Sequence, residues 1–167
     1  MSLALVLTVV VIALVAVLAG RAERHPVSGP LAIPLVDQPA AATASCRTLD
    51  DALSDDLAGL ARRQLVGQTE GVAAWGDPAV VLRCGVTDPR ELTCSAALVD
   101  VSRVQWLQLS DIGQTTYLAV DRPVRIALTL PDGTGTGAIQ EISAVVDQVL
   151  PARSVCDGHG SVVPARG

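Results

Sequence analysis

The start of the chain constrains the fold most, because a long apolar stretch without charges is poorly accommodated in a water-soluble domain. Residues 2–20 contain no charged side chain, and only Ser2 and Thr8 among them are polar. As a helix that rises about 1.5 Å per residue, this stretch is about 28 Å long, close to the hydrocarbon thickness of a bilayer. We therefore expect residues 1–20 to form a single-pass transmembrane anchor in the cell membrane.

A cleaved signal peptide is the alternative for the same stretch. Signal peptides have a basic start, a shorter apolar region and small residues at the cleavage site. Val17-Leu18-Ala19 and Gly20-Arg21-Ala22 offer such small residues. The length of the apolar region nevertheless favours an anchor, or a signal that is not cleaved.

Charge and cysteine content give opposite indications of the side of the membrane on which the domain lies. Arg21 and Arg24 follow the apolar stretch, and positive charge beside a membrane helix tends to stay cytoplasmic. Four cysteines instead suit an oxidising compartment, since an even set can pair as disulfides. They lack the close spacing of a zinc site. We expect an extracytoplasmic domain without a metal or cofactor.

The composition argues against a nucleic-acid partner. All twelve basic residues are arginine, and Lys, Asn and Phe are absent. Codons for these three amino acids are AT-rich, so a genome of high GC content explains the bias. The net charge is −5 and the arginines are scattered along the chain, which leaves no basic stripe for a phosphate backbone.

The rest of the chain divides into a linker, one domain and a tail. Residues 21–45 contain four prolines, each of which lacks a backbone donor and restricts the preceding residue, so we expect an extended stalk. The run Leu31 to Leu35 can instead add a strand or lie along the domain. Residues 46–156 are expected to form one domain, followed by an irregular tail over 157–167.

Hydrophobic periodicity predicts a helix near each end of this domain. Leucines at helical spacing predict an amphipathic helix over 47–62, with Ser45 as its cap; they are Leu49, Leu53, Leu57 and Leu60. A second apolar face predicts a helix over 137–150, which Pro151 ends.

Between the helices, apolar runs separated by turns predict strands over 79–85, 98–109, 114–120 and 123–130. The predicted fold class is α+β: an N-terminal transmembrane helix, then a small antiparallel sheet of about four strands packed with two helices.

The cysteines are expected to staple this domain. Cys84 and Cys94 flank a turn at Asp88-Pro89, so a hairpin could bring them within disulfide distance. Cys46 opens the first helix and Cys156 follows the second, and their ends would meet if the helices were antiparallel on one face. We therefore predict Cys84–Cys94 and Cys46–Cys156.

No motif in the chain specifies catalysis. The glycine-rich segment 131–137 lacks the lysine of a phosphate-binding loop, so it is interpreted as a turn. His25 and His159 lie far apart in irregular segments without a nucleophile motif. The acidic pairs lie on the predicted solvent face of the first helix, where they aid solubility.

The most distinctive stretch is 71–85, and it has two interpretations. Trp75-Gly-Asp-Pro followed by a strand can be a structural turn and strand start, with Asp77 and Arg83 paired. Alternatively, Trp75, Asp77 and Arg83 form a recognition surface, because exposed Trp and Arg are frequent interface anchors.

The chain also resembles the 3515 family of domains of unknown function. The resemblance rests on the apolar start, the proline-rich linker, the cysteine at the head of a leucine-rich helix, and a set of motifs: Trp75-Gly-Asp-Pro, Val-Leu-Arg-Cys-Gly85, Trp106 and Thr115-Thr-Tyr117. It implies a membrane-anchored protein of a high-GC Gram-positive bacterium, with no established activity. Leu118-Ala119 departs from the Gly-Arg expected after the tyrosine.

These observations favour a non-enzymatic envelope protein whose domain binds or supports another membrane or cell-wall component. One alternative is an enzyme or ligand-binding domain acting on cell-wall precursors, around Trp75, Asp77 and Arg83. Another is an accessory subunit of a larger membrane complex. A deep pocket with a perturbed acid would indicate the enzyme, and a shallow apolar patch would indicate a partner surface.

Overall fold

The computed structural model describes residues 29–67 and 69–165. The predicted anchor over 1–20 and the first part of the predicted stalk lie outside the described residues. Within the described part, no helix has the length and apolar character needed to span a bilayer.

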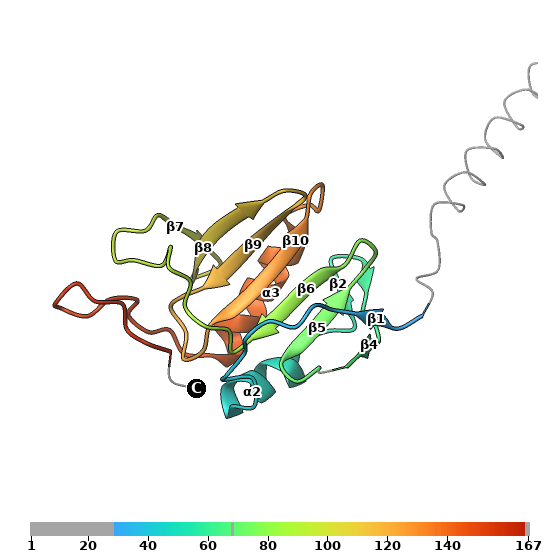
Figure 1. The fold of residues 1–167 in the computed structure, drawn as a ribbon, viewed down its shortest axis with the longest axis horizontal. Coiled ribbons are helices and arrows are strands. Elements are labelled where there is room, and N and C mark those ends of the chain that lie inside the picture. The colour runs from blue at the N-terminus through green and yellow to red at the C-terminus, as the bar shows by residue number, and fades with distance from the viewer. Residues whose placement is uncertain (1–28, 68, 166–167) are drawn as a thin grey trace, which may run out of the picture.

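A six-stranded antiparallel sheet forms the centre of the domain (Figure 1). Its spatial order is β5-β6-β10-β9-β8-β7. Strands β7 to β10 follow one another as a meander, and β5 and β6 form a hairpin that pairs with β10. The strands are β5 (Val72–Trp75), β6 (Val80–Cys84), β7 (Leu98–Val101), β8 (Val104–Asp111), β9 (Gln114–Ala119) and β10 (Ile126–Pro131).

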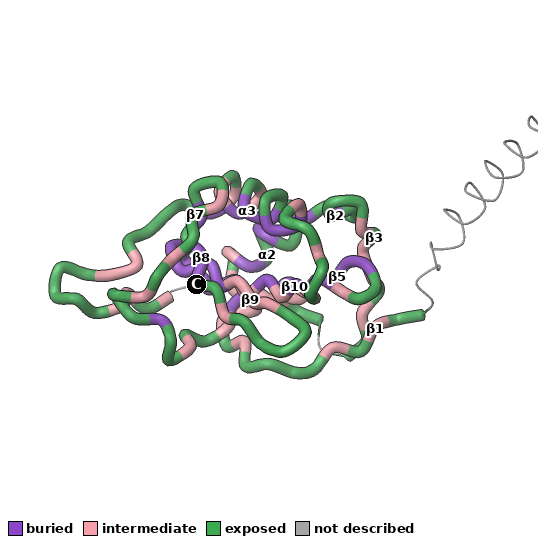
Figure 2. Tube along the Cα trace, turned by 90° about the horizontal axis from the view of Figure 1, so that it is seen from above, coloured by how far each residue is buried: buried purple, intermediate pink, exposed green. Residues whose placement is uncertain are grey.

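Two helices, α2 (Ala44–Ala52) and α3 (Gly137–Val149), cover one face of this sheet (Figure 1). Alternate residues of the strands point into the core, as in β6 and β10, where every second residue is buried. Figure 2 shows that buried residues concentrate between α3 and the strands. Trp75 and Trp106 are fully buried there, and their indole nitrogens donate to the Ser54 carbonyl and the Ser143 hydroxyl, both at 2.9 Å.

Short pairings flank the main sheet. Strand β1 (Leu31–Ala32) pairs in parallel with β4 (Leu65–Val66), and β2 (Asp56–Leu57) forms a small hairpin with β3 (Leu60–Ala61). The chain from β1 to α2 crosses in front of β5 and β6, on the face opposite the helices (Figure 1). The run from Leu31 to Leu35, for which a strand along the domain was one option, thus supplies β1.

The α+β class, the two helices and the antiparallel sheet are confirmed, and α3 matches the helix predicted over 137–150. The first helix is shorter than predicted, because Leu53 is already extended and residues 56–61 turn back as β2 and β3. Ala58 and Gly59 adopt positive φ there, which no helix tolerates. Its N-cap is Thr43, whose hydroxyl accepts the Cys46 amide at 3.4 Å, and not Ser45.

The sheet has more strands than predicted for two local reasons. The apolar run over 98–109 is interrupted at Ser102 and Arg103, whose φ values of 49° and 65° make a tight turn between β7 and β8. Residues 72–75, which lie outside the predicted strands, form β5. The segment after β3 supplies a backbone bond at its edge, from Arg63 N–H to Ala74 O at 2.8 Å.

The predicted disulfide pairing is wrong. The structure joins Cys46 to Cys84 and Cys94 to Cys156, with Cα–Cα distances of 5.6 Å and 5.9 Å. No hairpin links Cys84 to Cys94, because β6 pairs with β5 and β10 while residues 85–97 cross to β7 at the far edge of the sheet. Cys84 therefore faces α2 in the core, and Cys94 meets the C-terminal segment.

We predict that the two disulfides differ in their effect on stability. Chain entropy gives about 4 kcal/mol for each, because the separations of 38 and 62 residues differ little on a logarithmic scale. Cys46 and Cys84 are each 1% exposed, so replacing both by alanine also opens a core cavity. Urea unfolding followed by tryptophan fluorescence should show a larger loss for this pair than for Cys94 and Cys156 replaced together.

A separate measurement tests the disulfide connectivity directly. Non-reducing peptide mapping of the native chain should recover Cys46 joined to Cys84 and Cys94 joined to Cys156. A Cys84–Cys94 peptide, or four free thiols, would contradict the structure.

Candidate functional site

The structure does not bring Trp75, Asp77 and Arg83 together on one surface. Trp75 is fully buried in the core, while Asp77 lies exposed in the turn between β5 and β6. Arg83 is near the other end of β6 and points to the face opposite the helices, where it donates to the Pro34 carbonyl at 3.2 Å. Trp75 therefore serves the core, and Arg83 is the member of the set that reaches a hollow surface.

That surface is a groove of about 530 Å³ on the sheet face that the helices leave uncovered. Residues of β6, β10 and β9 whose side chains alternate away from the core form its floor; they are Val81, Arg83, Ala127, Thr129, Thr116 and Leu118. These side chains are mostly short, so the floor lies low between taller walls. The volume is within the range of small-ligand sites.

The polar groups of the floor are largely satisfied within it. Strands β6, β10 and β9 each pair on both sides, so their backbone groups are engaged in the sheet. The hydroxyls of Thr116 and Thr129 bond each other at 2.9 Å across the β9–β10 pair. The floor therefore offers side-chain surface and few free donors or acceptors.

One wall of the groove is residues 31–36, which we call the strap. Backbone bonds hold the chain at its start and just beyond its end: Leu31 N–H donates to Gln64 O at 2.8 Å, and Ala40 N–H, four residues after the strap, donates to Gly85 O at 3.2 Å. Gly85 has a φ of +85°, and an added Cβ would lie 2.4 Å from backbone atoms of Ala40 and Ala41. A glycine is required after Cys84 because the chain leading to α2 passes this closely.

Another part of the groove wall is Val86, Thr87 and Pro89, from the loop that follows β6. Arg125, only 2% exposed, holds this loop through an ion pair with Asp88. The same guanidinium donates to the carbonyls of Val120 and Val163, the second at 2.7 Å. One buried arginine therefore joins the groove wall to the sheet and the C-terminal segment.

Arg83 is the charged group of the groove. It lies beneath the strap and also lines a second hollow of about 210 Å³ on the strap's other side, near Asp37 and Glu70. Burial lowers the pKa of its guanidinium. Its hydrogen bond goes to a neutral carbonyl, and its charge forms no ion pair within the described residues.

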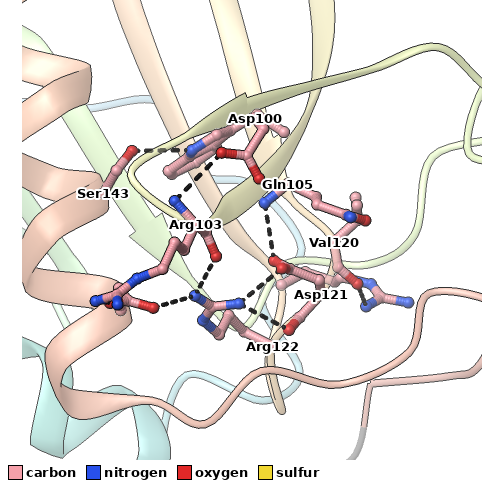
Figure 3. Close-up of polar contacts among 10 residues, drawn as sticks. Asp100, Arg103, Gln105, Val120, Asp121, Arg122 and Ser143 are labelled. Atoms are coloured by element: carbon pink, nitrogen blue, oxygen red, sulfur yellow. Dashed lines mark hydrogen bonds and ion pairs between the residues drawn. The ribbon is translucent and has the colours of Figure 1, made fainter.

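A second polar cluster surrounds Arg122, between the end of β9 and α3 (Figure 3). Its side chain is fully buried and pairs with Asp121 at 2.7 Å and with Asp147 at 3.2 Å. It also donates to the Arg103 carbonyl at 2.8 Å, and Arg103 itself forms an ion pair with Asp147. Two cations thus face two carboxylates, which compensates the charge inside the fold.

Asp121 is the acid that burial perturbs most clearly. Desolvation raises its pKa, against the opposing effect of the Gln105 amide, which donates to it at 3.1 Å, and of Arg122. Its carboxylate is engaged in this cluster and does not line the groove. We therefore assign Asp121 and Arg122 to holding β9, the β7–β8 turn and α3 together.

Sequence reasoning missed this cluster and the role of Arg125. The available signal was Asp121-Arg122-Pro123-Val124-Arg125, which places three charges beside an apolar run between two strands. The other residues considered for chemistry lie elsewhere: His159 is exposed in the tail, and the glycine-rich segment 131–137 connects the end of β10 to the start of α3. No group of three or more potential metal ligands occurs among the described residues.

A family model covers nearly the whole chain. The family described as Protein of unknown function (DUF3515) matches residues 3–155. The chain belongs to this family. No curated protein and no solved structure shows significant similarity to this chain. Membership thus confirms the resemblance seen in the sequence. The motif around Cys84 and Gly85 has a physical explanation in the disulfide and in the close passage of the Ala40–Ala41 backbone.

Replacing Arg122 by methionine should lower the free energy of unfolding by about 3–5 kcal/mol, because two carboxylates would lose their buried partner. Arg103→Met is the matched control, since the Arg103 side chain is 84% exposed and shares Asp147; its cost should stay below about 1 kcal/mol. Urea unfolding monitored by tryptophan fluorescence measures both. Equal losses would contradict the structural role of Arg122.

Proposed function

We propose that this chain is a non-enzymatic binding module of the cell envelope. In this proposal residues 1–20 anchor it in the membrane and the described domain lies outside the cytoplasm. The two disulfides support that side of the membrane, because such bonds persist in oxidising compartments.

The groove on the outer sheet face is the observation that carries the proposal. A domain stabilised only by its core needs no hollow on that face, and an open apolar surface with a polar rim is typical of a partner or ligand site. Apolar residues beside it remain exposed, including Leu35 at 77% and Val36 at 50% on the strap. Binding of another envelope component would cover this surface.

The arrangement of charges favours binding over catalysis. Among the described residues that line the groove, Arg83 alone has a charged side chain. General acid–base chemistry needs a titratable group within reach of the substrate, and the perturbed acid, Asp121, is engaged in the Arg122 cluster. An enzyme acting on cell-wall precursors therefore receives less support than a binding module.

A photoreactive side chain in the groove tests this function. Replacing Thr116 by p-benzoylphenylalanine places the probe on the groove floor, and irradiation of intact cells should give a cross-linked envelope component. Gln148, exposed on α3, is the control position. Cross-linking should be specific to Thr116 and should fall when Ala127→Phe fills the floor. Equal products from both positions, or none from Thr116, would contradict the proposal.

A further inference from the structure

We propose that the groove binds the acyl chain of an anionic membrane lipid, with the lipid phosphate at Arg83. This inference rests on the proposed function and names the ligand class of the same site. Three features of the groove lead to it: the character of its floor, the unpaired charge at one end and its distance from the predicted anchor.

The floor suits an aliphatic chain better than a peptide. An extended peptide brings backbone donors and acceptors that need partners, and unsatisfied groups in a dry site are costly. The floor strands use their own backbone groups in the sheet, and the Thr116 and Thr129 hydroxyls share one hydrogen bond, which leaves a single hydroxyl hydrogen free to donate. An acyl chain has no hydrogen-bonding groups that need partners, and burying it against Val81, Ala127 and Leu118 is favourable through the hydrophobic effect.

The length of the groove runs along the strands. Arg83 pairs with Ala127 in the register, which in turn lies beside Leu118, so these three form one end of the floor. Ala79 lies four residues before Arg83 and Gln114 four residues before Leu118, which corresponds to about 13 Å at about 3.3 Å per residue. The groove is therefore elongated, with its charged residue at one end.

Charge complementarity selects an anionic head group. Arg83 is partly desolvated beneath the strap, as the lowered pKa of its guanidinium reflects, and its hydrogen bond reaches only the Pro34 carbonyl. A guanidinium has five N–H donors in a planar fork that matches a phosphate. Asp37 and Glu70 line the adjoining hollow, but neither forms an ion pair with Arg83. A phosphate at this end would supply that close ion-pair partner.

The predicted anchor keeps the groove close to lipid. Leu31, at the start of the strap, follows the end of the predicted anchor at residue 20 by eleven residues. A fully extended chain spans at most about 3.3–3.6 Å per residue, which places this wall within about 40 Å of the bilayer surface. With the proposed anchor, the short connection keeps the domain near the bilayer, which makes membrane lipid the apolar ligand we favour.

The test uses the full chain in phosphatidylcholine vesicles that contain a phospholipid with a photoreactive acyl chain. Two arms carry the same acyl chain, one on phosphatidylglycerol and one on phosphatidylcholine. After irradiation, mass spectrometry should find label on floor peptides that contain Val81, Thr116 or Thr129, with phosphatidylglycerol several-fold more efficient. Arg83→Gln should lower labelling by phosphatidylglycerol about tenfold, the effect of one charge-assisted hydrogen bond, and remove the preference.

Matched variants separate the ligand from general damage. Arg90→Gln removes a charge whose side chain is 93% exposed and should leave labelling unchanged. Ala127→Phe should abolish labelling of the floor by both lipids, whereas Ala97→Phe, at an exposed position before β7, should not. Unchanged tryptophan fluorescence would show that each variant is folded.

Floor peptides left unlabelled by either lipid, or labelling insensitive to both Arg83→Gln and Ala127→Phe, would overturn the lipid proposal. If the probe at Thr116 still captured a protein, the proposed binding function would stand with a different ligand. Failure of both experiments would remove the groove as a binding site altogether.

Discussion

The fold depends on the junction at Cys84 and Gly85, where β6 ends. All four backbone groups of these residues are used: the Cys84 and Gly85 amides donate to Gly71 and Arg125, and their carbonyls accept from Gln38 and Ala40. The Cys84 side chain is meanwhile bonded to α2 through Cys46. One dipeptide thus joins β5, β10, the first helix and the chain that leads from the strap.

The two faces of the sheet differ: one packs against the helices as the core, and the other forms the groove for which we propose a binding role. Large side chains such as Trp106 and Ile126 fill the face beneath the helices, and the same alternation leaves short side chains on the other face. The strap and the loop held by Arg125 rise above this low floor and create the groove. The buried charges around Arg122 lie away from the groove and hold α3 to the β7–β8 turn and the end of β9. The stability of the domain therefore does not depend on polar side chains in the groove.

Periodicity predicted the parts of the fold that are local, and it failed where distant segments decide. The helix at 137–150 and the strands β9 and β10 could be predicted from spacing alone, whereas the run over 98–109 was predicted as one strand and forms two. The disulfides could not, because the pairing depends on residues 85–97 crossing the whole sheet to β7, a non-local choice. Trp75 illustrates the same limit for the site: its type suggested an exposed anchor, but the Ser54 carbonyl satisfies its indole inside the core. Arg83 was identified, and the groove around it was not, since its floor comes from three strands.

Hydrogen exchange at the junction tests this account most directly. The Ala40 amide donates to Gly85 and the Leu31 amide to Gln64, so both should exchange slowly in the full native chain. Gly85→Ala places a Cβ against the backbone of Ala40 and should release the Ala40 amide to fast exchange while the amides of α3 stay protected. Exchange of Ala40 at the unfolded rate in the unmodified chain would contradict the fixing of the chain after the strap at Gly85, and with it the groove wall that the strap forms.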